Sequence, residues 1–244
     1  MKIVDVNLYT GGFDALKREA SPDKLAEMMK TYGISCGIIY HQFAKLDPKK
    51  GNSLTFEISL SSGGALKSCV VLDPALGEDS LEGTGGLADR LRAFSPSAAV
   101  VFPTEQRVVF DAFYFSEILE SLNVLSMPLI IRANYDFDFF RHLPEIAFSY
   151  PNVKFILTDY GICGSRNVFP LLKYTKNVFF TIEKMLDHRQ IEEICERGGE
   201  DRLLFGSGYP DFSPAGALGL VKFAFITEKQ KVKIFSLNWE EIGQ

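Results

Sequence analysis

Polar and ionisable residues stand at eight places along the chain where an apolar stretch ends. In chain order they are Asn7 and Tyr9, His41 and Gln42, Asp73, Thr104 and Glu105, Arg132 and Asn134, Asp159 and Tyr160, Glu183, and then Gly208, Tyr209 and Asp211. Carboxylates and histidine transfer protons, and arginine binds carboxylates or phosphates through paired hydrogen bonds. If the apolar stretches are strands that end at one rim, these side chains share a pocket there.

Arg132 has two interpretations, because its part of the rim also offers Asp159 and Glu183. It can form an internal ion pair with one of these carboxylates, or it can bind the carboxylate or phosphate of a small ligand. An acidic cluster around Arg132 would favour the ion pair. The pKa of Asp159 depends on the same choice, since burial raises it and a neighbouring guanidinium lowers it.

His41, Asp159 and Glu183 are the candidates for catalysis. His41 ends the second apolar stretch and is the histidine expected at the rim, with a hydrogen-bonded loop position as the alternative. His142 and His188 fall at predicted helix starts and are expected in solvent. The substrate-binding candidates are the arginine and the neutral polar residues of the rim, namely Arg132, Asn7, Tyr9, Asn134, Tyr160 and Tyr209. The tyrosines among them can equally be buried structural donors.

The apolar stretches themselves are short and rich in β-branched and aromatic residues, which is typical of parallel strands buried on both faces. They are Ile3–Leu8, Ile34–Tyr40, Ser68–Leu72, Ala98–Phe102, Leu129–Ile131, Val153–Leu157, Val178–Thr181 and Leu203–Phe205. Helical patterns follow seven of them, the first opened by Ser21-Pro22 and ended by Gly33. This order predicts one α/β domain over residues 1–244, a single (β/α)8 TIM barrel with eight parallel strands. A doubly wound open sheet is the alternative, but the first strand lacks the glycine fingerprint of that fold.

The second unit of this pattern is irregular. The segment His41–Ser62 is polar and shows no convincing helix, and Ser53–Leu60 alternates as a hairpin strand would. We therefore expect an irregular loop insertion after strand 2, at the barrel mouth, that acts as a lid or as an oligomer contact.

Composition excludes several classes of protein. The 244 residues carry a net charge of -5, which argues against nucleic acid as a partner. No apolar run approaches the roughly 18 residues of a membrane span, so no membrane partner is expected. The N-terminus lacks the layout of a signal peptide, and the 4 cysteines form no Cys-x-x-Cys motif, which together predict a cytoplasmic protein. A small-molecule ligand is the expected partner, with a homo-oligomer as an open alternative.

Several segments resemble, in order, the strand motifs of one enzyme family. Ile3–Tyr9 resembles a first strand of pattern Asp-x-His-x-His, Met127–Arg132 a fifth strand that ends in histidine, Val153–Gly161 a sixth strand of pattern Leu-Ala-His-x-Gly, and Leu203–Pro210 a last strand of pattern Phe-Gly-Ser-Asp-Tyr-Pro. Asn238 stands where an asparagine opens the terminal helix. The chain thus resembles the amidohydrolase superfamily, in the branch of metal-dependent hydrolases and related decarboxylases.

The resemblance implies a divalent metal that activates water, with an aspartate on the last strand as proton shuttle. The sequence departs from the motif at each such position, with Asn7, Tyr9, Arg132, Asp159 and Gly208 in place of the usual residues. Asparagine is a poor ligand, arginine stays charged, and glycine has no side chain. We therefore expect neither a metal nor another cofactor, and we expect Gly208 to open space in the mouth.

Two functions follow from this comparison. The first is a hydrolase of a C–O or C–N bond, of lactonase or amidohydrolase type, or a metal-free lyase, acting on a small anionic molecule. The second is a catalytically inactive pseudoenzyme that binds a small molecule or a protein. The barrel itself supports either function.

Overall fold

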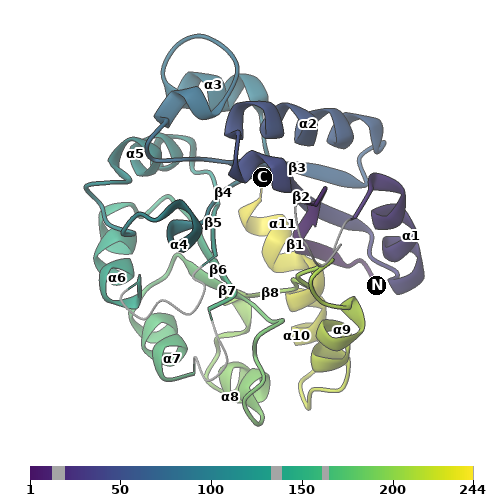
Figure 1. The fold of residues 1–244 in the computed structure, drawn as a ribbon. Helices are drawn as coiled ribbons and strands as arrows, with labels where there is room; N and C mark the ends of the chain where they lie inside the picture. The colour runs from purple at the N-terminus through teal and green to yellow at the C-terminus, as the bar shows by residue number, and fades with distance from the viewer. Residues whose placement is uncertain (13–19, 133–138, 161–164, 244) are drawn as a thin grey trace.

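Eight parallel strands follow one another around a barrel in sequence order in the computed structural model, which describes residues 1–12, 20–132, 139–160 and 165–243 (Figure 1). They are β1 (Val4–Thr10), β2 (Cys36–His41), β3 (Leu66–Val71), β4 (Ala98–Val101), β5 (Leu129–Arg132), β6 (Phe155–Thr158), β7 (Val178–Thr181) and β8 (Leu203–Leu204). Backbone hydrogen bonds close the ring between the first and last strands, from Val6 to Phe205 and from Gly208 to Asn7, both 3.0 Å long. The predicted (β/α)8 barrel is confirmed.

Helices surround this barrel, as Figure 1 shows. The α-helices are α1 (Pro22–Tyr32), α2 (Pro48–Ser61), α3 (Leu87–Phe94), α4 (Pro103–Gln106), α5 (Ser116–Leu125), α6 (Phe139–Ser149), α7 (Ser165–Tyr174), α8 (Gln190–Glu196), α9 (Pro214–Lys222), α10 (Glu228–Val232) and α11 (Asn238–Ile242). Short 3-10 turns are η1 (Gln42–Lys45), η2 (Gly77–Ser80) and η3 (Glu200–Arg202), and η4 (Lys233–Leu237) is a π-helical segment. Helix α1 has the predicted ends, because Ser21 accepts a hydrogen bond from the amide of Lys24 and Gly33 adopts φ 70°.

The predicted irregular insertion after β2 was wrong, and so was its hairpin strand. The segment forms η1 and then α2, which begins at Asp47 and Pro48 with the same cap-plus-proline signal that opens α1. Helix α2 lacks a clear apolar stripe because it buries polar residues. The Asn52 amide donates to the carbonyls of Val71 and Ser80, at 2.8 and 2.9 Å, and accepts from the Val71 amide. Asn52 thereby fixes the end of β3.

Apolar side chains fill two layers, one inside the barrel and one between the strands and the helices. Val6 and Ile130 belong to the inner cluster, together with Trp239 of α11. Leu8 and Ile131 belong to the outer cluster. Neighbouring residues such as Ile130 and Ile131 thus face opposite layers, β1 departs from this alternation between Val6 and Leu8, and α11 packs its indole against the barrel interior. Polar residues, rather than this apolar layer, occupy the carboxyl ends of the strands.

Candidate active site at the barrel mouth

Arg132, the last residue of β5, lies at the centre of the mouth. Its Nη1 donates to the hydroxyl of Tyr40 at 3.0 Å, its Nη2 donates to the carboxylate of Asp159, and Asp211 Oδ2 lies 3.7 Å from Nη2. Burial alone would lower the pKa of Arg132, but Tyr40 and Asp159 outweigh burial and raise it, so the guanidinium stays charged. Of the two interpretations of Arg132, the structure shows the internal ion pair, and it shows the acidic cluster that favours it.

Lys184 is a second buried cation in this group, and the sequence interpretation missed it. Its Nζ lies 3.4 Å from Asp159 Oδ1 and 3.9 Å from the centroid of the Phe212 ring. Burial would raise the pKa of Asp159, but Arg132 and Lys184 outweigh burial and lower it. Asp159 is therefore ionised and clamped between two cations, and it adopts a left-handed backbone, with φ 55°. Lys184 directly follows Glu183, which the sequence places at the rim, so this position could have been predicted from the end of the same apolar stretch.

Tyr9 and Asp211 extend the same cluster toward β1. The Tyr9 hydroxyl donates to Asp211 Oδ1 at 2.6 Å, and burial and then this carboxylate raise the pKa of Tyr9. The register of β1 shifts between Asp5 and Leu8, which places Tyr9 in the inner layer with its ring 5.7 Å from that of Tyr40. Predicted ligand-binding residues and the buried ion pair thus form one network.

A second polar group lies under the junction of β1, β7 and β8. Glu183 Oε1 accepts from Asn7 Nδ2 at 3.1 Å and from Thr181 Oγ1 at 2.8 Å, whereas its buried Oε2 has no hydrogen-bond partner among the described residues. Asp5 Oδ1 accepts from the amides of Asn7 and Ser207. Burial raises the pKa of both carboxyls to about 7. Asn7 therefore donates hydrogen bonds to two buried carboxyls whose pKa values are raised toward neutral pH.

The remaining candidates lie in different places. His41 Nδ1 accepts from the Phe43 amide at 3.1 Å, and burial lowers the pKa of His41, so the imidazole is neutral. Tyr160 packs in the outer layer, where its hydroxyl donates to the Thr181 carbonyl at 2.9 Å. Tyr209 is half-buried next to β8. Asn134 lies outside the described residues.

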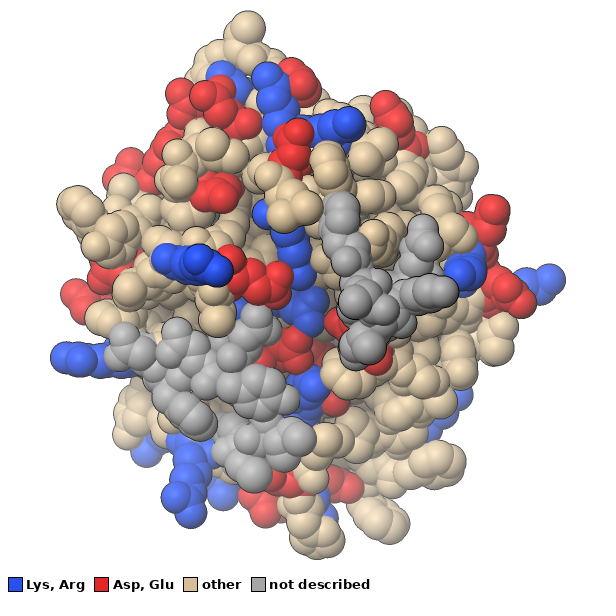
Figure 2. Space-filling model, viewed as in Figure 1, with Lys and Arg blue, Asp and Glu red and all other residues tan. Residues whose placement is uncertain are grey.

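The space beside Gly208 is filled, which corrects our expectation. A side chain at Gly208, which adopts φ +70°, would meet the Phe212 ring at 3.0 Å. The ring also lies against Lys184. Phe212 therefore covers this side of the cluster. Figure 2 shows basic and acidic side chains gathered at the centre of the face that it presents.

Metal binding needs several ligands that converge. Within residues 1–12, 20–132, 139–160 and 165–243, no three His, Cys, Asp or Glu side chains are placed to hold a metal ion. At the mouth, Asp159 contacts the two cations Arg132 and Lys184. In the same part of the chain, no helix combines the length and apolar character needed to cross a bilayer.

Comparisons with known proteins show the fold. No family model matches the sequence, and no curated protein is similar to it in sequence. A Staphylococcus aureus protein provisionally assigned as an amidohydrolase is similar in structure, with a TM-score of 0.76 and 15% identity over 100% of both chains. The 2,6-dihydroxybenzoate decarboxylase from Rhizobium has a TM-score of 0.77 and 13% identity, covering 99% of this chain and 98% of that one. The 5-carboxyvanillate decarboxylase from Novosphingobium aromaticivorans, solved with bound manganese, has a TM-score of 0.77 and 14% identity, covering 99% and 96%. The resemblance seen in the strand motifs is confirmed at the level of the fold.

Proposed function

We propose that this chain is a divergent enzyme of the amidohydrolase superfamily that acts as a hydrolase or lyase on a small anionic molecule, with fixed cations at its mouth instead of a divalent metal. The observation that carries the proposal is the pair of buried cations, Arg132 and Lys184, which meet at Asp159. Buried charges of this kind at the carboxyl ends of barrel strands are typical of a functional site.

The residues of the mouth do not suit a divalent cation. Arg132 and Lys184 repel one, and the Asp159 carboxylate is already paired with both of them. Asn7 donates its amide hydrogen to Glu183 rather than offering an oxygen to an ion from that side. The chemistry proposed below therefore uses side chains alone.

Lys184 is a better anchor for an anion than Arg132. Arg132 acts indirectly, because it holds the Asp159 carboxylate that also contacts Lys184. The hydrogen bonds from Nη1 to Tyr40 and from Nη2 to Asp159 fix the orientation of the Arg132 guanidinium, and its buried Nε has no hydrogen-bond partner among the described residues. The Lys184 ammonium has three hydrogens, and its contacts are the Asp159 carboxylate at 3.4 Å and the face of Phe212. A substrate carboxylate or phosphate would bind Lys184 in low dielectric, where charge-assisted hydrogen bonds are strong.

Glu183 is the group we propose for proton transfer. Its pKa of about 7 suits a general base at neutral pH, whereas the lowered pKa of Asp159 makes that carboxylate a weak base. In hydrolysis of a lactone, Glu183 would take a proton from a water molecule while the oxygen of that water attacks the carbonyl carbon. The ring C–O bond then breaks, and the leaving oxygen takes the proton from Glu183. His41, neutral at this pH, is the second candidate for the same task.

A binding module without catalysis is the alternative, and one observation favours it. Arg132 and Asp159 satisfy each other, as they would in a cluster that only stabilises the barrel end. The same ligands would then bind with no turnover.

A ligand and substrate screen tests the proposal. We expect small carboxylates, lactones or phosphates to raise the melting temperature, and Lys184→Met to abolish this rise, whereas Lys30→Met, at an exposed lysine of α1, leaves it unchanged. Turnover of a lactone should increase with pH through about 7 and be lost in Glu183→Gln. Binding without turnover would support the pseudoenzyme, and no shift with any anion would refute both.

A further inference from the structure

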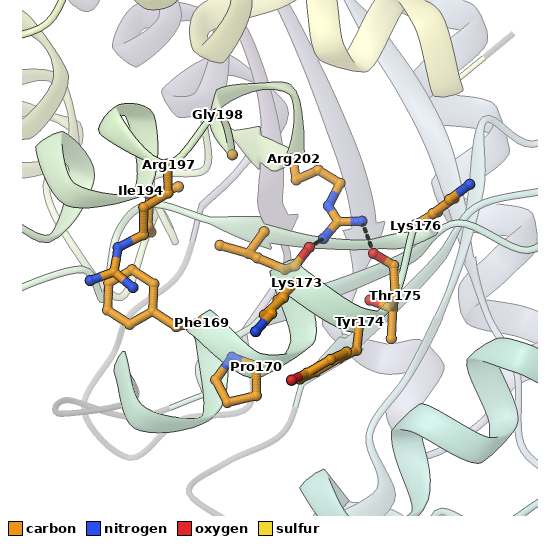
Figure 3. A pocket seen from close by; sticks show the side chains of 12 residues that line it. Phe169, Pro170, Lys173, Tyr174, Thr175, Lys176, Ile194, Arg197, Gly198 and Arg202 are labelled. Atoms are coloured by element: carbon orange, nitrogen blue, oxygen red, sulfur yellow. Dashed lines mark hydrogen bonds between the residues drawn. The ribbon is translucent and has the colours of Figure 1, made fainter.

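A cavity of about 790 Å³ lies between the ends of α7 and α8 (Figure 3). Its walls come from the last turn of α7 with the residues that lead into β7, and from the end of α8 with the turn before β8. These segments precede strands, so they lie at the amino ends of β7 and β8. The volume is in the range of small-molecule sites, roughly 300–1,000 Å³. Nothing in the proposed chemistry uses this cavity.

The lining of the cavity is strongly basic although the whole chain carries a net charge of -5. Lys173, Lys176, Arg197 and Arg202 line it, and no Asp or Glu is among the described lining residues. Within the described chain, no ion pair joins any of these four to a carboxylate. Like charges held near one another without carboxylate partners attract an anion.

The ends of two helices lie at this cavity, with Lys173 in the last turn of α7 and Arg197 at the C-cap of α8. The carbonyls at the end of α7 are negative and need donors, and Arg202 supplies them. Its Nη atoms donate to the carbonyls of Leu171, Leu172 and Thr175, at 3.4, 2.7 and 2.5 Å. Arg202 is thereby a fixed wall of the cavity, as the dashed lines in Figure 3 show. Among the described residues, the side chains of the other three cations make no such hydrogen bond, so they remain available to a ligand.

Aromatic rings stand beside the cations. The Arg197 guanidinium lies 4.4 Å from the centroid of Phe169, and Lys173 Nζ lies 5.0 Å from that of Tyr174. Figure 3 places Phe169 with Arg197 on one side of the cavity and Tyr174 on the other. These contacts attract Arg197 and Lys173 to the faces of the two rings. The cavity thus offers positive charge and a place for a planar ring.

We propose that this cavity is a second ligand site, which binds a small molecule that joins an aromatic ring to a phosphate, of the nucleotide class. A phosphate carries up to about two negative charges and several acceptor oxygens, which suits the three cations other than Arg202 better than a single carboxylate does. The ring would pack between Phe169, Pro170 and Tyr174.

Calorimetric titration of the full chain at low salt, with adenosine monophosphate, inorganic phosphate and adenosine as separate probes, tests this site. We expect the monophosphate to bind at least about tenfold more tightly than either fragment, because only it engages both rings and cations. The double variant Lys176→Ala with Arg197→Ala should raise its Kd by at least about tenfold. Both residues are exposed, so the fold should persist, which circular dichroism checks.

Lys30→Ala, which removes an exposed positive charge from α1, is the matched control and should bind like the wild type. The proposal is overturned if the monophosphate binds no better than phosphate, or if the double variant binds like the wild type. It is also overturned if Lys184→Met abolishes binding and the double variant does not, since the nucleotide would then occupy the mouth.

Discussion

Glu183→Gln should make the stability of this protein less sensitive to pH. Burial raises the pKa of Glu183 from 4.5 to about 7, against the opposing hydrogen bond from Thr181. Between these two pH values the folded chain keeps a proton that the unfolded chain has released. The contribution of Glu183 to the free energy of unfolding therefore falls as pH rises through this window and levels off above about 7.

The size of this effect follows from the same pKa difference. About 2.5 pKa units at 1.36 kcal/mol each correspond to about 3 kcal/mol lost between pH 4.5 and pH 8. Glutamine cannot ionise, and it keeps an oxygen for the hydrogen bonds from Asn7 and Thr181. The variant should match the wild type near pH 5 and exceed its stability by up to about 3 kcal/mol at pH 8.

Urea unfolding at several pH values, followed by the fluorescence of the single tryptophan, Trp239, measures this difference. Trp239 is buried in the inner layer, so its emission reports on the barrel. Glu57→Gln, at an exposed position of α2, is the control and should follow the wild type at every pH. A difference between Glu183→Gln and the wild type that is constant with pH, or that grows toward acid, would refute the assigned pKa and with it the proposed base.

Three further substitutions test the packing around the site, each by urea unfolding at pH 7. Arg132→Met should lower the free energy of unfolding by about 3–5 kcal/mol, because Asp159 loses the nearer of its two cations. Adding Asp159→Asn should recover part of this loss. A loss below about 1 kcal/mol in Arg132→Met would show that the pair is solvated. Gly206→Ala should cost about 1–3 kcal/mol, since its new methyl would lie 3.0–3.1 Å from three neighbouring atoms, whereas Gly216→Ala, with open space in α9, should be neutral or stabilising. Asn52→Ala should cost roughly 3 kcal/mol by leaving buried backbone groups unpaired, and an unchanged stability would mean that water replaces the amide.

The barrel and the Arg132–Asp159 pair could be predicted from sequence because both depend on regular geometry. Neighbouring parallel strands end at one rim, so the last residue of β5 and the residue that follows β6 must lie close together. Arg132 and Asp159 stand at these ends. Strand order and apolar pattern were therefore enough to bring them together.

Three other parts of the site depend on contacts that no local pattern carries. Tyr40, the partner of Arg132, lies inside an apolar strand, and this sequence context predicts a residue of the hydrophobic core. Tyr9 reaches the mouth because the register of β1 shifts, which a regular alternation does not predict. Helix α2 was missed because Asn52 and Thr55 replace an apolar face, although Asp47 and Pro48 gave the start signal. In each case tertiary hydrogen bonds decide what the pattern leaves open.

Metal content of the purified, unchelated protein, measured by mass spectrometry of the elements, tests the central proposal most directly. Fixed cations at Asp159 in place of a metal predict well below one zinc or manganese ion per chain, with ligand binding at the mouth unchanged by a chelator. One tightly bound divalent metal per chain, lost together with ligand binding on chelation, would contradict the account.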